Sequence, residues 1–172
     1  MSTKVVGAVR KAFPDEVIGD HAERGDHTVI VKPGRLVEIV RFLHDDPETD
    51  MSHFCDLTVV DWPGRESRFE VVIHLHSLAA GHRIRVKTSV PAQSPVVPSI
   101  TAVYRGADWF EREAFDLYGV RFEGHPDLRR ILLWEGFEGH PLRKDYPKQQ
   151  RQCPVPLLED RPGQPPPFPE RP

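Results

Sequence analysis

Three neighbouring segments of the chain alternate apolar and polar side chains with a period of two. They are residues 55–61 (CDLTVVD), 68–77 (RFEVVIHLHS) and 82–88 (HRIRVKT), separated by Pro63-Gly64 and Ala80-Gly81. Successive side chains of a β-strand point to opposite faces, so each segment predicts a strand with one apolar face. Such a sheet must bury its apolar face, which limits the chain to folds in which another layer covers the sheet.

The opposite face of the predicted sheet is charged. Its side chains on two strands are Glu70, His74, His76, Arg83, Arg85 and Lys87. On the first strand, the alternation places Cys55 on the apolar side with Leu57 and Val59. We therefore expect water or a polar partner on the charged face and one layer of helices on the apolar face.

The N-terminal part of the chain supplies that layer. Apolar residues three or four apart predict one helix at 5–13 and a second at 36–43, directly after Pro33. Segments 17–18 and 27–31 predict one or two further strands. The sequence thus predicts an α+β fold with a two-layer core, in which a mixed sheet of about five strands carries helices on one face.

The most strongly indicated helix lies within residues 100–120 (ITAVYRGADWFEREAFDLYGV). Asp108 and Glu111 have the spacing of a capping box, and Gly119 is typical of a helix end. The helix has an apolar face formed by Phe110, Ala114, Leu117 and Tyr118. We expect its charged residues, Glu111, Arg112, Glu113 and Asp116, on an exposed face.

Beyond Gly119 the periodicity fades, and Gly and Pro become frequent. We divide the chain into an α+β core domain (1–119), a docking extension (120–147) and an extended tail rich in Pro and Arg (148–172). The tail ends in PVPLLEDRPGQPPPFPERP, which excludes helix and has too few apolar residues for a core. It is expected to become ordered only along partner proteins.

Composition excludes several classes of protein. The 172 residues carry a formal net charge of -3, so no basic excess favours a nucleic-acid partner. No apolar run approaches the roughly 20 residues that span a bilayer, and the N-terminus lacks the pattern of a secretory signal, so we expect a cytoplasmic location. Cys55 and Cys153 are the only two cysteines, which leaves too few for a zinc ribbon or a four-cysteine iron–sulfur site.

Two pairs of histidines are candidate metal ligands. His74 and His76 share one strand face, but the nearest third ligand is Glu70 and cationic neighbours oppose a metal, so a solvated face is favoured. The motif FEGHP occurs twice, at 122–126 and 137–141, and contains His125 and His140. These histidines could share a metal or anchor two loops, and the missing third ligand favours anchoring.

The pair Glu111 and Glu113 does not suit acid–base catalysis. Two positions on a helix turn the side chains about 200 degrees apart, so both cannot face one substrate. Ion pairs on the helix surface and salt bridges to a partner remain the two alternatives.

The segment from Glu111 to Leu132 resembles the signature of the 30-kilodalton subunit family, also called the C-subunit family, of respiratory NADH:quinone oxidoreductase (complex I). The matching residues are Glu111, Arg112, Glu113, Asp116, Leu117, Tyr118, His125, Arg129, Ile131 and Leu132. Residues 135–147 (EGFEGHPLRKDYP) are also similar to the family. The resemblance covers roughly residues 1–147.

This resemblance implies a structural and assembly subunit of the hydrophilic arm of a proton-translocating complex, with no catalytic, cofactor or metal residue of its own. It implies packing against the large quinone-site subunit and near the iron–sulfur subunits, so flavin and clusters are expected on partners. The assembly would be membrane-bound, with this chain peripheral on the cytoplasmic face of the cell (inner) membrane. The alternative is the equivalent subunit of a ferredoxin-linked photosynthetic or membrane-bound hydrogenase complex.

The helix predicted within residues 100–120 and the extension supply the expected contacts with partner subunits. The residues predicted for this interface are Glu111, Arg112, Glu113, Asp116, His125, Arg129, Arg130, His140, Arg143, Lys144, Asp145 and Tyr146. Arginine suits such a surface because its guanidinium binds carboxylates through two hydrogen bonds.

Overall fold

A computed structural model describes residues 2–147, 149 and 152. Its five-stranded sheet has the order β1-β2-β5-β4-β3. The strands are β1 (Val17–Glu23), β2 (Asp26–Val31), β3 (His53–Asp61), β4 (Phe69–Ser77) and β5 (His82–Val90). Only β2 and β5 pair in parallel, and the other neighbours are antiparallel. The predicted mixed sheet of an α+β fold is therefore confirmed.

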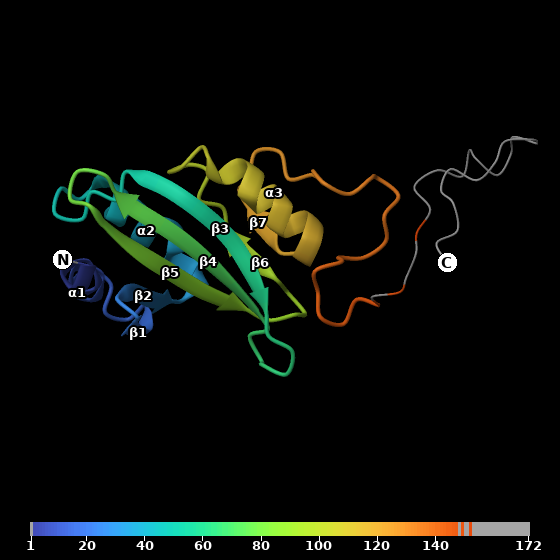
Figure 1. Ribbon diagram of the computed structural model, residues 1–172, viewed down its shortest axis with the longest axis horizontal. Helices are drawn as coiled ribbons and strands as arrows, with labels where there is room; N and C mark the ends of the chain where they lie inside the picture. The colour runs from blue at the N-terminus through green and yellow to red at the C-terminus, as the bar shows by residue number, and fades with distance from the viewer. Residues whose placement is uncertain (1, 148, 150–151, 153–172) are drawn as a thin grey trace, which may run out of the picture.

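Helices α1 (Ser2–Ala12) and α2 (Leu36–Asp45) lie on one face of this sheet (Figure 1). A short 3-10 helix, η1 (Pro33–Arg35), leads into α2, as the position of Pro33 predicts. The core between the helices and the sheet is formed by apolar residues from the predicted helices and strands. Its fully buried members include Val9, Ile39, Val40, Leu43, Val71, Ile73, Leu75 and Val86.

The placement of Cys55 with Leu57 and Val59 was wrong. The pairing of β3 with β4 shifts register between Phe54 and Asp56, so that Cys55 is an extra residue in a β-bulge. Leu57 and Val59 are buried, whereas Cys55 is exposed. Period-two alternation fails here because a bulge adds one residue to the strand.

A second, two-stranded sheet joins β6 (Val96–Pro98) to β7 (Arg121–Glu123) in parallel. Helix α3 (Ala107–Tyr118) connects these strands and lies beside β3 (Figure 1). The sequence predicted α3 but neither short strand. Pro95 tolerates this pairing because its carbonyl accepts the Arg121 N–H at 2.8 Å and no proline N–H is needed.

Beyond β7, the extension passes along α3 before the described chain ends (Figure 1). Of the predicted tail at 148–172, the structure describes only Gln149 and Gln152. The predicted extended path of the tail thus lies outside the described residues.

Candidate docking surface

Helix α3 begins without the predicted capping box. Gly106 is its N-cap residue, with no side-chain hydrogen bond at this end. Glu111 is instead fully buried, and its carboxylate accepts hydrogen bonds from Ser99 Oγ (2.7 Å) and the Ile100 N–H (2.8 Å). The prediction failed because the loop after β6 brings two donors to Glu111. Glu111 therefore joins α3 to that loop.

Burial raises the pKa of the Glu111 carboxyl to about 7. The hydrogen bonds from Ser99 and Ile100 act in the opposite direction, and the nearby Asp108 carboxylate adds to the increase. No salt bridge with Glu111 occurs within the described part of the chain. A substantial fraction of this buried acid is therefore neutral near pH 7.

Asp116, also fully buried, binds residues in the middle of the extension. Its Oδ2 accepts three successive backbone N–H groups, from Ile131 (3.1 Å), Leu132 (2.8 Å) and Leu133 (2.9 Å). Its Oδ1 accepts a hydrogen bond from Arg130 Nη1 at 3.0 Å. Burial acts to raise the pKa of the Asp116 carboxyl, but these donors outweigh it and leave that pKa lowered. Asp116 thus remains a charged anchor for residues 130–133.

The predicted exposed charged face of α3 is therefore only half correct. Glu111 and Asp116 are inside the molecule, whereas Glu113 is exposed and Arg112 is half-buried. A charge pattern indicates exposure because burying an unpaired carboxylate is costly, yet donors from distant segments stabilise both acids.

Arg112 also binds the extension of the same chain. Its Nε and Nη2 donate to the backbone carbonyls of Arg129 and Arg130, each at 3.2 Å. The guanidinium carbon lies 5.6 Å from the centre of the Trp109 ring. Arg112 therefore links the outer surface of α3 to residues 129–130, directly before the backbone N–H groups that bind the buried Asp116.

The two FEGHP copies hold the two ends of α3. In the first copy, His125 Nε2 donates to the carbonyl of Asp108 at 3.3 Å, and His125 Nδ1 accepts the Asp127 N–H at 3.0 Å. In the second copy, His140 Nδ1 donates to the carbonyl of Asp116 at 2.8 Å. Loop anchoring, the favoured alternative for these histidines, is therefore confirmed within the chain itself.

The end of α3 requires glycine at position 119. Gly119 has φ 73°, and a Cβ there would clash with the side chains of His140 and Arg143. Arg143 Nε donates to the Tyr118 carbonyl at 2.6 Å, one of the acceptors left free at a helix end. Burial lowers the pKa of His140, which favours the neutral ring at this helix end.

A second buried carboxylate fixes the far end of the extension to the core. Asp61, at the end of β3, accepts two hydrogen bonds from Arg68 (2.6 and 2.7 Å) and one from the Lys144 N–H (2.7 Å). Arg68 also pairs with Asp145 at 2.8 Å. The role of Asp61 and Arg68 escaped prediction because their partners in the extension, Asp145 and Lys144, are about 80 residues away along the chain.

Few of the predicted interface cations remain available to a partner. Arg129 is exposed, and its side chain forms an ion pair with its near neighbour Asp127 at 2.8 Å. Lys144 is also exposed, and its side chain has no ion pair in the described part of the chain. Tyr146 is half-buried and stacks on Phe137, with ring centres 6.0 Å apart. The role of these residues in a partner interface stays a prediction.

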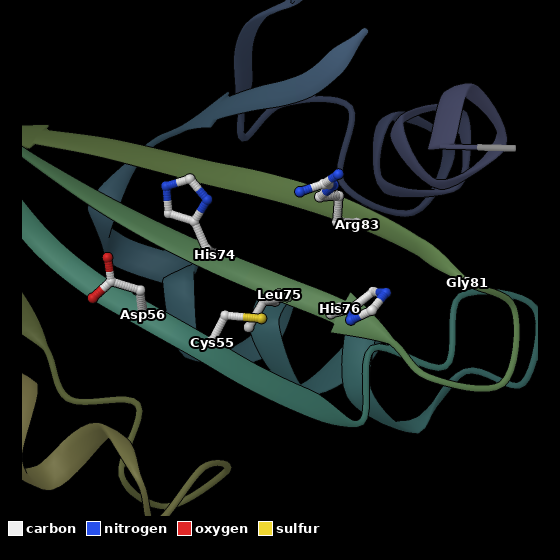
Figure 2. Close-up of a pocket in the computed structure, with 7 residues that line it drawn as sticks. All are labelled: Cys55, Asp56, His74, Leu75, His76, Gly81 and Arg83. Carbon is white, nitrogen blue, oxygen red and sulfur yellow. The ribbon is translucent and has the colours of Figure 1, made fainter.

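The charged sheet face carries a shallow hollow lined by Cys55, Asp56, His74, His76 and Arg83 (Figure 2). His74 and His76 point outward from β4 with the acidic Asp56 on the neighbouring strand. Burial and the neighbouring Arg85 lower the pKa of His74. Among residues 2–147, 149 and 152, no three His, Cys, Asp or Glu side chains could together hold a metal ion.

Two solved structures share this α+β fold. It resembles a solved trypsin-resistant fragment (1–134) of Nqo5, with a TM-score of 0.63 and 28% identity over 74% of this chain and 98% of the fragment. It also resembles a chain of the archaeal membrane-bound sulfane sulfur reductase, with a TM-score of 0.72, 24% identity and 86% coverage of both chains. This second likeness concerns the fold alone.

The chain belongs to the family of the 30 Kd subunit of respiratory-chain NADH dehydrogenase, whose model matches residues 29–152. It is 46% identical to the C subunit of the NADH-quinone oxidoreductase of Roseiflexus castenholzii, over 91% of this chain and 90% of that protein. It is 51% identical to the corresponding C subunit of Rhodopseudomonas palustris, over 79% of this chain and 66% of that protein. The predicted family is therefore confirmed.

No helix in the described part of the chain is long and apolar enough to cross a membrane.

Proposed function

We propose that the chain is a structural and assembly subunit, without a cofactor, of the hydrophilic arm of a proton-translocating NADH:quinone oxidoreductase. The observation that carries this proposal is the use of the signature residues. Asp116 and His125 form internal hydrogen bonds that hold α3 and the extension together, and Glu111 joins α3 to the loop after β6. A surface fixed in this way loses little conformational entropy when another protein binds, which suits a subunit that positions its neighbours.

We infer that its partners are the large quinone-site subunit and the iron–sulfur subunits of that arm, which carry the flavin and clusters. The assembly is bound to the cytoplasmic face of the cell membrane, where this chain is peripheral. The exposed Arg129 and Lys144 remain its candidate charge contacts. The names of the curated relatives favour this role over a ferredoxin-linked or hydrogenase complex.

A deletion strain tests this proposal. Loss of the chain should abolish NADH:quinone oxidoreductase activity in membranes and prevent formation of the intact complex on native gels. A tagged wild-type chain should restore both and co-purify with flavin- and iron–sulfur-containing subunits. Normal activity in the deletion strain, or co-purification with a hydrogenase or ferredoxin-dependent complex, would contradict the proposal.

Purification of the chain alone provides the second half of the test. The isolated chain should show no visible absorption band after chelation and gel filtration, and no NADH oxidation or quinone reduction. A bound chromophore that survives both treatments would overturn its assignment as a subunit without a cofactor.

A further inference from the structure

An apolar groove lies between α3 and the first part of the extension. Its lining residues are Trp109, Phe110, Glu113, Ile131 and Leu132. Trp109 and Leu132 are 65% and 63% exposed, the most open of the large apolar residues in this region. Clustered exposed apolar side chains with a polar rim are typical of a protein–protein contact, and a tryptophan is often its strongest contributor.

Both walls of the groove are fixed before any partner binds. Asp116 holds the backbone of Ile131 and Leu132 from inside the molecule. On the outer wall, Arg112 lies over the Trp109 ring and donates to the carbonyls of Arg129 and Arg130. Phe110 packs edge-on against Phe54, with ring centres 5.3 Å apart. Little conformational entropy is therefore lost at this surface on binding.

The charge at the rim indicates the chemistry of the occupant. Glu113 is exposed at the edge of the groove and forms no ion pair in the described part of the chain. The Arg112 guanidinium is directed to the backbone carbonyls of the extension, and Glu113 is the charged residue among those that line the groove. An apolar side chain flanked by Lys or Arg would fill the groove and pair with Glu113.

We propose that this groove receives a segment of a neighbouring subunit in which a large aliphatic or aromatic side chain stands beside a Lys or Arg. The contact rests on the proposed function, because the neighbour is a subunit of the same complex. It differs from the predicted arginine-rich interface, since Trp109 and Leu132 provide the main contact and Glu113 selects the charge of the partner.

Variants at the groove test the contribution of its apolar surface. In cells that lack the native chain, Trp109→Ala with Leu132→Ala should lower the amount of chain recovered in the intact complex by about tenfold or more. Ile18→Ala with Leu78→Ala is the matched control, since both side chains are 65% exposed elsewhere on the surface. The control should leave recovery unchanged. Equal recovery of both double variants would overturn the proposal.

Charge changes at the rim test the partner's chemistry. Glu113→Gln should weaken retention in the complex, and Glu113→Lys should weaken it further. Glu113→Asp should largely rescue it. In washes of increasing salt, the wild-type chain should become easier to remove while the Gln variant changes less, because the lost interaction is electrostatic. Retention of Glu113→Lys equal to wild type would rule out the basic partner residue.

A photocrosslinker identifies the occupant directly. Benzoylphenylalanine at position 132, in the complex within native membranes, should crosslink to another subunit at an apolar residue within a few positions of Lys or Arg. A crosslink to residues 153–172 of the same chain, to a second copy, or to an acidic segment would overturn the proposal. If the tagged wild-type chain enters the complex and the groove variants enter it equally well, this inference fails while the proposed function stands. Absence of the wild-type chain from any NADH:quinone oxidoreductase would contradict both.

Discussion

The sheet core and the extension are stabilised in opposite ways. The core buries apolar side chains such as Ile73 and Leu75 between the sheet and helices α1 and α2. The extension has little apolar core and instead attaches through donors that converge on Asp116 and Asp61. Stability is thus shared among many contacts in the core and concentrated in a few polar groups in the extension. Single substitutions should therefore destabilise one region without the other in the extension, and both together in the core.

Removal of the Asp116 carboxylate should give the largest difference between the two regions, because it should release the extension and leave the core folded. Asp116→Ala leaves Arg130 and three backbone N–H groups without their buried acceptor. Loss of one partner of a buried charge pair costs about 3 to 5 kcal/mol. Trypsin cleavage after Arg129 and Arg130 should become much faster, while the amide protons of β4 and β5 stay protected from exchange.

Ile73→Ala is the matched comparison for that experiment. It removes a fully buried core side chain, which costs about 2 to 5 kcal/mol. It should lower the unfolding temperature of the sheet and expose both regions together. If Asp116→Ala also removed exchange protection from β4 and β5, the two regions would be a single cooperative unit.

Glu111 should make stability depend on pH. Its pKa rises from the ordinary 4.5 to about 7 in the folded chain. The folded state therefore holds the proton more tightly, so this contribution to the free energy of unfolding is complete below about pH 4.5 and is lost as pH rises through about 7. The loss is about 3 kcal/mol at most.

Urea unfolding between pH 4 and pH 8 measures that contribution. Glu111→Gln keeps a neutral side chain of the same shape, so the difference between wild type and variant should change with pH in favour of the variant at high pH. A difference that is constant across this range would show that Glu111 is ionised in the folded chain.

Gly119→Ala should have a smaller effect, confined to the junction of the two regions. A left-handed backbone costs a residue with a Cβ about 1 to 2 kcal/mol, and here the Cβ would also displace His140 and Arg143. Faster amide exchange at residues 140–146 is the expected result. Gly7→Ala is the control, because Gly7 lies in α1 with open space around it and should leave exchange unchanged.

Arg129→Glu should change the stability of the isolated chain least. Its side chain is 71% exposed, and surface substitutions of this kind usually alter the free energy of unfolding by about 0.5 kcal/mol or less. Its effect on recovery of the complex should be larger, since it reverses a charge on the proposed contact surface. Thermal melting of the chain and quantitation of the intact complex measure the two effects separately. A folded chain that assembles normally would remove Arg129 from the interface.

Much of the fold could be predicted from the sequence because its signals are local. Alternation placed the strands around Leu57, Ile73 and Val86, and the three-to-four spacing placed α2 from Leu36. The bulge at Cys55 and the strands β6 and β7 escaped prediction. A bulge depends on the partner strand, and a three-residue strand has too few positions to show a period.

Some residues of the candidate site were predicted from the sequence, but most of their contacts were not. The resemblance to the family covered Glu111, Asp116, His125 and His140, and the structure places all four at or beside α3. Anchoring by the two histidines was predicted, whereas the hydrogen bonds of Glu111 and Asp116 within the chain and the exposed groove at Trp109 were not. Residue type suggested a charged surface for a partner, whereas the folded chain uses most of these charges to hold its own extension.

The sequence by itself determined the alternating strands, the amphipathic helices and the left-handed helix end at Gly119, because each depends on neighbouring residues and on the steric limits of the backbone. Only the tertiary structure decided which polar groups are internal. A carboxylate is stable in the interior when donors from distant segments reach it, as Ser99 reaches Glu111 and residues 131–133 reach Asp116. Those donors become neighbours only after the chain has folded, so no local pattern records them.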